Sequence, residues 1–393
     1  HDHLMSTPRV LFYVQHLLGI GHLKRATTLA RAMTEQGLNV TVVSGGEFVP
    51  VIDDRGMNFV QLPAIRSADR TFSALVDADG IGLSDTLKTR RRAKLLNLFS
   101  ELCPQILIIE LFPFGRRQLE FELIPLLDAA KVAKQRPVIV SSVRDILVEK
   151  NNPHRVEEMV KKAKAYFDRI LVHGDPDFIT FDKTFPRALE LADMLHYTGY
   201  VVERQRHTSS NETKGKGEVI VSSGSGAVGE LLLRSAQRIR PYTYLSDVNW
   251  RLLAGHYMEE KVFKSIHDAA VEGVIVERAR PDFINLLKNC RLSISQGGYN
   301  TVMEVLATGA NGIAIPYAGG QETEQTLRVK LMEERGLIRQ IPEARLSDKI
   351  LIDTVNNTQH QKPSKSNSIN LDGAIASANL VASWAKELKD SYA

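Results

Sequence analysis

The strongest chemical signal in the sequence is a glycine pair between an apolar run and a helical pattern. The segment reads Leu292-Ser293-Ile294-Ser295-Gln296-Gly297-Gly298-Tyr299-Asn300-Thr301-Val302-Met303-Glu304. Glycine lets a ligand approach the backbone, and the free N–H groups at a helix start attract a diphosphate. Glu304 follows about one turn later, where a carboxylate can accept both hydroxyls of a ribose. The pattern predicts a nucleotide site comprising Gly297, Gly298, Asn300, Thr301 and Glu304; a turn that binds nothing is the alternative.

Two further segments carry small and polar residues after an apolar run. Ser223-Gly224-Ser225-Gly226 follows the run 218–222 and predicts a second contact to phosphate. Pro316 to Gln325 is a glycine-containing loop before a polar helix start, and its Gln321, Glu324 and Gln325 are suited to sugar hydroxyls. The alternative for this loop is a solvated helix start whose acidic residues lie near the helix dipole.

The candidates for proton transfer lie in the first half of the chain. His22 follows the turn Gly19-Ile20-Gly21 at a predicted helix start, where it would titrate near neutrality. The helix dipole disfavours the protonated imidazole, which suits a base or a neutral hydrogen-bond donor. Glu110 and Asp145 follow apolar runs and are rival bases. A surface histidine that caps the helix is the alternative for His22.

Three arginines accompany these candidates. Arg116 and Arg117 lie in the loop Glu110-Leu111-Phe112-Pro113-Phe114-Gly115-Arg116-Arg117, and Arg144 precedes Asp145. Guanidinium groups bind carboxylates and phosphates through two parallel hydrogen bonds, so these arginines are candidates for holding an anionic acceptor or a diphosphate. The alternatives are solvated arginines in a surface loop and a salt-bridged turn at 144–145.

The elements that must position these residues alternate between strand and helix. Short apolar, β-branched runs predict buried strands, and helical spacing lies between them. The predicted strands are 10–14, 40–43, 59–62, 106–109, 138–141, 170–172, 218–222, 250–254, 274–277, 292–295 and 313–316. This alternation predicts parallel sheets covered by helices. Because the strand, small-residue turn and helix pattern restarts at 218, we expect an α/β protein of two Rossmann-like, doubly wound domains facing an interdomain cleft.

The polar stretch 204–217 places the domain boundary. We expect an N-terminal acceptor domain at 5–200, a C-terminal donor domain at 201–370, and a closing helix at 371–393. A chain of 393 residues is long enough for two such cores, and 43% of its residues are hydrophobic.

Charge and cysteine content exclude several classes of function. A net charge of +4 indicates an anionic small ligand or an acidic membrane surface rather than nucleic acid. The two cysteines lack metal-site spacing, and no acidic pair such as Asp77-Ala78-Asp79 lies in a suitable loop, so we expect neither cofactor nor metal. Without a leader or an apolar run of about 20 residues, we expect a cytoplasmic protein.

One segment suggests contact with a membrane. Residues 87–99 place five basic side chains among apolar ones at helical spacing: Lys88, Arg90, Arg91, Arg92 and Lys94. A basic amphipathic helix can lie on an anionic membrane on the cytoplasmic side, while a solvated helix face is the alternative.

Taken in order, these motifs resemble the MurG-like family 28 glycosyltransferases, and a predicted-glycosyltransferase subgroup within them. The run Ser295 to Glu304, Gly309, Pro316 and Glu324-Gln325 resembles their donor half. Leu18-Gly19-Ile20-Gly21-His22 and Ser223-Gly224-Ser225-Gly226-Ala227 resemble their glycine loops. The segments 110–117 and 142–145 are shared with the subgroup. Ile20 interrupts the first loop, and Glu324-Gln325 stands where the family has Gln-Gln.

The resemblance implies a GT-B fold and an inverting, metal-independent transfer of a sugar from a nucleotide-sugar, typically a UDP-sugar. The implied acceptor is a hydroxyl of a glycan, a lipid-linked molecule or a small molecule. Gly21 would then belong with the donor loops. Two alternatives stay open. A UDP-sugar 2-epimerase shares the architecture but usually has Gln-Glu-Glu where Tyr299-Asn300-Thr301 stands, and a non-catalytic protein would bind nucleotide-sugar without turnover.

Overall fold

The computed structural model describes residues 7–17, 19–50, 52–68, 74–147, 152–203, 214–224, 227–316, 323–358 and 369–391. The chain divides into two compact units: His1–Val202 with Ile369–Ala393, and Glu203–Ser368. The segment that sequence analysis set apart as a closing helix therefore belongs to the first unit. The predicted cleft between the two domains stays a prediction.

The first unit is built on a seven-stranded parallel sheet in the order β3-β2-β1-β6-β7-β8-β9. Its strands are β1 (Arg9–Val14), β2 (Asn39–Ser44), β3 (Asn58–Gln61), β6 (Ile106–Glu110), β7 (Val138–Arg144), β8 (Arg169–His173) and β9 (Leu195–Tyr197). A small antiparallel pair, β4 (Ile65–Ser67) and β5 (Leu75–Asp77), follows β3 in the sequence. Sequence analysis missed β4, β5 and β9, which are three residues long each.

Helices cover both faces of this sheet. They are α1 (Gly21–Glu35), α2 (Asp85–Leu102), α3 (Glu120–Val132), α4 (Pro153–Tyr166) and α11 (Gly373–Ser391), with short 3-10 helices η1 (Arg117–Leu119), η2 (Phe181–Lys183) and η3 (Pro186–Met194). Alternate residues of β1 enter different cores: Phe12 packs with α1 and α11, and Leu11 packs with α2 and α3. Burial on both faces explains why β1 is an unbroken apolar run.

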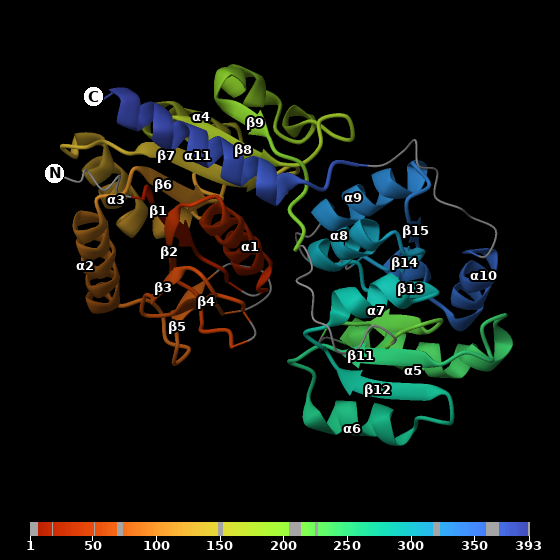
Figure 1. Cartoon of the computed structure of the whole chain (residues 1–393). Coiled ribbons are helices and arrows are strands. Elements are labelled where there is room, and N and C mark those ends of the chain that lie inside the picture. Colours follow the sequence, from red (N-terminus) through yellow and green to blue (C-terminus); the bar gives the residue numbers. More distant parts are fainter. Residues whose placement is uncertain are drawn as a thin grey trace. The chain divides into compact units, whose positions relative to one another are not determined.

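Helix α11 returns to the first unit after the second unit is complete (Figure 1). Its Val381 and Trp384 join the core formed by α1 and β1. Backbone hydrogen bonds join the two places where the chain leaves and re-enters the first unit. Tyr200 N donates to Asn370 O, and Gly373 N donates to Tyr200 O. The first unit is thus one core made from two separate stretches of chain.

The second unit repeats the plan with a six-stranded parallel sheet in the order β12-β11-β10-β13-β14-β15. Its strands are β10 (Val219–Ser222), β11 (Trp250–Ala254), β12 (Val274–Arg278), β13 (Leu292–Ser295), β14 (Gly312–Ala314) and β15 (Arg339–Gln340). Its helices are α5 (Ala227–Ile239), η4 (Arg240–Tyr242), α6 (Glu260–Asp268), α7 (Phe283–Asn289), α8 (Tyr299–Thr308), α9 (Thr323–Glu334), η5 (Glu343–Arg345) and α10 (Asp348–Thr358). Both sheets have the Rossmann order predicted from the alternation of elements.

Candidate functional site

In both units, some of the candidate residues lie at the carboxyl ends of the two strands at which the strand order reverses. In the first sheet His22 comes after β1, and Glu110 is the last residue of the neighbouring strand β6. In the second sheet Gly224 comes after β10, and Gly297 comes after its neighbour β13. Because open α/β sheets bind ligands outside the carboxyl ends of their strands at this switch point, each unit has its candidate residues where the fold favours a ligand.

The imidazole of His22 lies against a buried ion pair in the first unit. Nδ1 of His22 is 3.2 Å from Oε1 of Glu110 and 3.0 Å from Nη2 of Arg25. Arg25 donates to the same Oε1, and the side chains of Arg25 and Glu110 are each 1% exposed, against 21% for His22. Ile20 holds the cap position of α1 and no side chain caps the helix, so His22 is not the capping residue.

Burial and the surrounding charges keep the His22 imidazole neutral. Burial, with the positive charges of Arg144, Arg116 and Arg25, lowers the pKa of His22 to about 3, although the hydrogen bond that Glu110 accepts from His22 opposes the shift. Burial alone would raise the pKa of Glu110, but the charge of Arg25 and the contact with His22 outweigh it and hold that pKa well below its usual range. His22 is therefore a neutral imidazole at physiological pH, and Glu110 is a carboxylate.

Asp145 lies beyond the end of β7 and is completely buried. The hydroxyl of Tyr200 donates to its Oδ2 at 2.5 Å. Gly174 allows this close packing, because a Cβ at that position would lie 2.5 Å from Cβ of Asp145. Of these candidate bases, His22 is partly exposed to solvent, whereas the Asp145 carboxylate is not.

The three candidate arginines do not lie together. Arg116 adopts the left-handed region with φ +63°, and its Nε donates to the backbone oxygen of Gln15 at 2.8 Å. Arg144 ends β7, and its charge, like that of Arg116, reaches His22. Arg117 is exposed at the start of η1. Two of the three cations thus act on the candidate base, and the third lies on the surface.

Sequence analysis missed His173, the last residue of β8. Its imidazole is completely buried: Nε2 is 2.8 Å from Oγ of Ser142, and Nδ1 is 2.9 Å from Oγ1 of Thr198. Burial first, and then the charge of Arg25, lower the pKa of His173 to about 3, and the charge of Glu110 acts against them. The sequence held one sign of it, because His173 is a polar residue directly after the predicted strand 170–172.

In the second unit, the backbone after β13 turns sharply into α8. Gly297 has φ +76°, and a Cβ there would lie 3.2 Å from Cα of Pro316, so the turn requires glycine. Gly298 is the cap residue of α8 and no side chain caps this helix. Asn300 and Thr301 lie in its first turn, half-buried. This is the arrangement of backbone donors that the glycine pair predicted.

Glu304 lies within the same helix and is 5% exposed. It falls one turn after the cap region, as its spacing indicated. Glu304 thus lies near the uncapped start of α8, where the sequence predicts a carboxylate for ribose hydroxyls.

The loop after β10 is linked to the loop after β13. The backbone N–H of Gly224 donates to Oε1 of Gln296, and Ser222 is in register with Ser295. Within the described residues, the buried hydroxyl oxygens of Ser223 and Ser295 have no hydrogen-bond partner. The two predicted phosphate loops are therefore neighbours. Ser225 and Gly226 lie outside the described residues.

Glu324 and Gln325 at the start of α9 both contact the completely buried Arg328. Nη2 of Arg328 donates to Oε1 of Glu324 at 2.6 Å, and Nη1 donates to Oε1 of Gln325 at 3.1 Å. The guanidinium also stacks over the ring of Tyr299 in α8, 4.7 Å from its centre. The pair thus helps to hold α9 against α8. Gln321 lies outside the described residues.

Two Asp-x-Asp pairs in the described residues accept hydrogen bonds from the backbone. Oδ1 of Asp77 accepts from the backbone N–H groups of Asp79 and Ile81, each at 2.9 Å. A second pair, which sequence analysis passed over, follows β8: Asp175 accepts from the backbone N–H of Asp177 and of Asn370. Across the described ranges, no three His, Cys, Asp or Glu side chains are grouped to hold a metal ion.

Helix α2 departs from the expected basic surface at one residue, and the inclusion of Arg91 in that surface was wrong. Arg91 is completely buried and donates to both carboxylate oxygens of Glu122, at 3.0 and 2.6 Å. It also donates to Oε1 of Gln15 at 2.8 Å, and Tyr13 donates to Glu122 at 2.7 Å. No helix among the described residues is long and apolar enough to cross a membrane.

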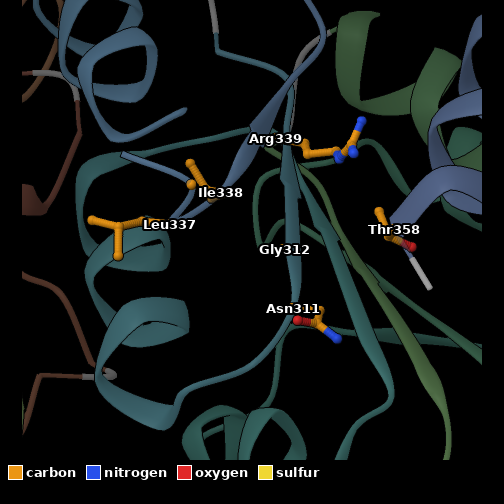
Figure 2. A pocket seen from close by; sticks show the side chains of 7 residues that line it. Asn311, Gly312, Leu337, Ile338, Arg339 and Thr358 are labelled. Carbon is orange, nitrogen blue, oxygen red and sulfur yellow. The ribbon is translucent and has the colours of Figure 1, made fainter. Parts of the chain in front are cut away.

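A small hollow lies away from these residues. It holds about 20 Å³ beside Asn311, Gly312, Ile338, Arg339 and Thr358 (Figure 2). Gly312 begins β14, whereas the candidate residues follow the ends of strands. Since the sheet is parallel, the hollow lies at the amino-terminal ends of the strands, opposite the candidate residues. Its volume has room for one or two water molecules. It is not a candidate for a nucleotide.

A known protein family matches part of the chain. Residues 258–383 match the glycosyltransferase family 28 C-terminal domain, a span that includes α8 and the glycine pair. No curated protein sequence matches the chain.

Solved structures share the fold at low identity. CalG4, the calicheamicin glycosyltransferase, is 14% identical with a TM-score of 0.62, over 98% of each chain. MurG of Acinetobacter baumannii is 13% identical with a TM-score of 0.55, over 96% of this chain and 100% of that one. A putative UDP-N-acetylglucosamine 2-epimerase from Listeria monocytogenes is 10% identical with a TM-score of 0.58, over 96% and 95%.

Two Rossmann-like units, each with candidate residues at its switch point, define a protein of the GT-B class. Residues 258–383 form a glycosyltransferase family 28 C-terminal domain, the family that the glycine motifs of this part of the chain resemble.

Proposed function

We propose that the chain transfers a sugar from a nucleotide-sugar, preferentially a UDP-sugar, to a hydroxyl acceptor with inversion at the anomeric carbon. The observation that carries the proposal is the partly exposed His22 imidazole, held by Glu110 at the carboxyl ends of the strands of the first sheet. A neutral imidazole with partial exposure can take a proton from an alcohol at physiological pH. The second unit supplies the donor site, with its uncapped α8 start and buried Glu304.

The proposed step forms one bond and breaks one bond at the anomeric carbon. The acceptor hydroxyl gives its proton to Nε2 of His22, and its oxygen bonds to the anomeric carbon from the face opposite the diphosphate. The bond between that carbon and the diphosphate oxygen breaks, and its electron pair leaves with the nucleoside diphosphate. Backbone N–H groups at Gly298 to Thr301 would stabilise the departing charge, aided by the loop at Ser223 and Gly224. In this proposal the step needs no metal ion.

A thermal-shift screen of nucleoside diphosphates and nucleotide-sugars, first without metal and then with magnesium, tests the donor site. Ligands that bind the native state raise the melting temperature, so UDP or a UDP-sugar should do so without metal. No shift with any nucleotide would refute the donor site. The proposal assigns the acceptor side to Arg116, Arg117 and Arg144, with a glycan, a lipid-linked molecule or a small molecule as acceptor.

Substitution of the candidate base tests the chemistry. His22→Ala should lower turnover by about 10²- to 10⁴-fold, the range for general-base catalysis, with little change in UDP affinity. Full turnover in this variant would transfer the role to Asp145 or Glu110. Incubating donor without acceptor separates the rival class, because an epimerase would release free epimerised sugar. Donor binding without turnover on any acceptor would favour a non-catalytic binding protein.

We further propose a cytoplasmic location, supported by two free cysteines, and contact of α2 with an anionic membrane. Of its basic residues, Lys88 lies over the ring of Phe121, Lys94 donates to the backbone oxygen of Gln61, and Arg90 is exposed. Sedimentation with vesicles containing anionic lipid tests this contact. Equal sedimentation with neutral vesicles would refute it.

A further inference from the structure

We propose that Arg25 is a positioning residue for His22: it holds Glu110 as a carboxylate against Nδ1, so that Nδ1 carries the imidazole proton and Nε2 is left to accept one. The inference rests on the proposed function for its role in turnover. Arg25 belongs to none of the sequence motifs that predicted the site, and the structure alone brings it there.

The geometry is a compact triangle of three groups. Arg25 lies one helical turn after His22 on α1, which places both side chains on one face of the helix. Their two nitrogens, Nη2 and Nδ1, are 3.0 Å apart, and both converge on Oε1 of Glu110 at the end of β6. Among the described residues, the other oxygen, Oε2, is buried without a hydrogen-bond partner. One carboxylate oxygen therefore serves both donors.

The charge of Arg25 decides the ionisation state of Glu110. Removal from water raises the pKa of a carboxyl group, and Glu110 is almost completely buried. Arg25 is the largest influence that opposes burial. A protonated Glu110 would donate rather than accept, and Nδ1 would then have to accept and leave its proton on Nε2. In that tautomer Nε2 cannot take a proton from an acceptor hydroxyl.

Burial is the main cause that keeps the imidazole of His22 unprotonated, and the charge of Arg25 adds to it. The charged groups that act on His22 are Glu110 from β6, Arg116 from the following loop, Arg144 from β7 and Arg25 from its own helix. His173 from β8 faces Arg25 and Glu110 and is itself neutral. Removing Arg25 takes away a cation that favours the neutral imidazole and the ionised carboxylate. We therefore expect either an imidazolium at His22 or a protonated Glu110.

The experiment measures the tautomer directly, by NMR of protein labelled with ¹⁵N-histidine, with His22→Gln used to assign the His22 signal. In the wild type, His22 should be neutral with its proton on Nδ1, and should not titrate between about pH 5 and 8. In Arg25→Met, most of that form should be replaced at pH 7 by the imidazolium or by the Nε2–H tautomer. A wild-type signal from the Nε2–H tautomer, in which Nδ1 accepts from Arg25, would overturn the inference, and so would an unchanged signal in Arg25→Met.

Arg31→Met is the matched control, because Arg31 is a buried arginine of the same helix that contacts Asp53 instead. It should leave the His22 signal unchanged. In the pH profile of turnover, Arg25→Met should show a loss of activity at low pH, because His22 then becomes protonated. The loss should be about tenfold per pH unit below the pKa of His22 in the variant, and UDP affinity should be unchanged. If Arg25→Met does not fold, the wild-type tautomer still decides, and Arg25→Lys should retain the Nδ1–H form.

The NMR measurement needs no substrate, which separates the two proposals. If the tautomer changes as expected but His22→Ala keeps full turnover, the assignment of the base is wrong and the structural role of Arg25 stands. If His22→Ala is inactive and the tautomer is insensitive to Arg25, the assignment of His22 as the base stands and the role of Arg25 is wrong.

Discussion

Acidification should destabilise the first unit through its buried histidines, and His173 gives the sharpest test. Both ring nitrogens of His173 are within 2.9 Å of hydroxyl groups, and the residue has no exposed surface. His173→Gln removes the titrating group while an amide can still donate to one hydroxyl and accept from the other. The quantity to measure is the change in unfolding free energy between pH 7 and pH 5, compared between wild type and variant.

The sign and size follow from the pKa difference between the folded and unfolded states. Burial lowers the pKa of His173 from 6.5 to about 3 in the folded state, so the unfolded chain binds the proton first. The stabilisation is complete above pH 6.5 and is lost as the pH falls toward 3. One pKa unit corresponds to about 1.4 kcal/mol, so the fall to pH 5 costs about 2 kcal/mol for this histidine alone. His16, with a pKa lowered to about 4 mainly by burial, adds a similar loss.

The two tryptophans make the assay specific to each unit. Trp384 of α11 lies in the core of the first unit, and Trp250 of β11 lies in the core of the second. Urea unfolding followed by fluorescence of Trp250→Phe reports the first unit, and Trp384→Phe reports the second. The first unit of His173→Gln should lose about 2 kcal/mol less between pH 7 and pH 5 than the wild type.

The second unit is the internal control. Its described histidines, His256 and His267, are both exposed, so its stability should change less over this interval. An equal loss in wild type and His173→Gln would refute the argument, because it would mean that His173 accepts its proton without unfolding. An acid-sensitive second unit beside an acid-stable first unit would refute it as well.

Three further predictions concern the donor loop and the cores. Glu304→Ala should weaken UDP binding by about 1–3 kcal/mol, measured by calorimetry, since a buried carboxylate bonded to ribose would be lost; unchanged affinity would remove the ribose assignment. Gly297→Ala should weaken UDP binding in the same assay, because φ +76° strains any other residue by roughly 1–2 kcal/mol. Arg91→Met should cost the first unit about 3–5 kcal/mol in urea unfolding, because Glu122 keeps a buried charge; adding Glu122→Leu should recover part of it.

Local patterns predicted the parts of the fold that depend on short stretches of sequence. The run of β1, the turn before α1 and the start of α8 after Gly298 were all expected, because strand, glycine and helix signals lie within about 15 residues of one another. Strands β4 and β5 were not expected, since they are too short for an alternating pattern to stand out.

The candidate site was predictable only where a residue belongs to such a local motif. His22 follows a glycine turn, and Glu110 ends an apolar run. Arg25 and His173 acquire their roles from contacts with residues distant in sequence: Glu110 is 85 positions from Arg25, and Thr198 is 25 positions from His173. Hydrophobic periodicity carries no information on such pairs.

Arg91 shows where the sequence held a signal that was not used. It lies four residues before Leu95 and eight before Phe99, so helical spacing places it on the apolar face of α2. Counting basic residues along the segment placed it on the surface, although its position on the helix indicated the core. A charge on the buried face predicts a buried partner, which the structure identifies as Glu122.

The return of α11 fixes an order of events when the protein is made. Chains emerge from the ribosome amino end first, and a domain generally folds once all of it is available. The second unit is synthesised in one stretch, whereas the face of α1 that packs on Val381 and Trp384 has no cover until that whole unit has been translated. The unit made first is therefore completed last. During translation α11 cannot yet cover the apolar face of α1, so a mutation in α11 should act on the newly made protein before it acts on the finished one.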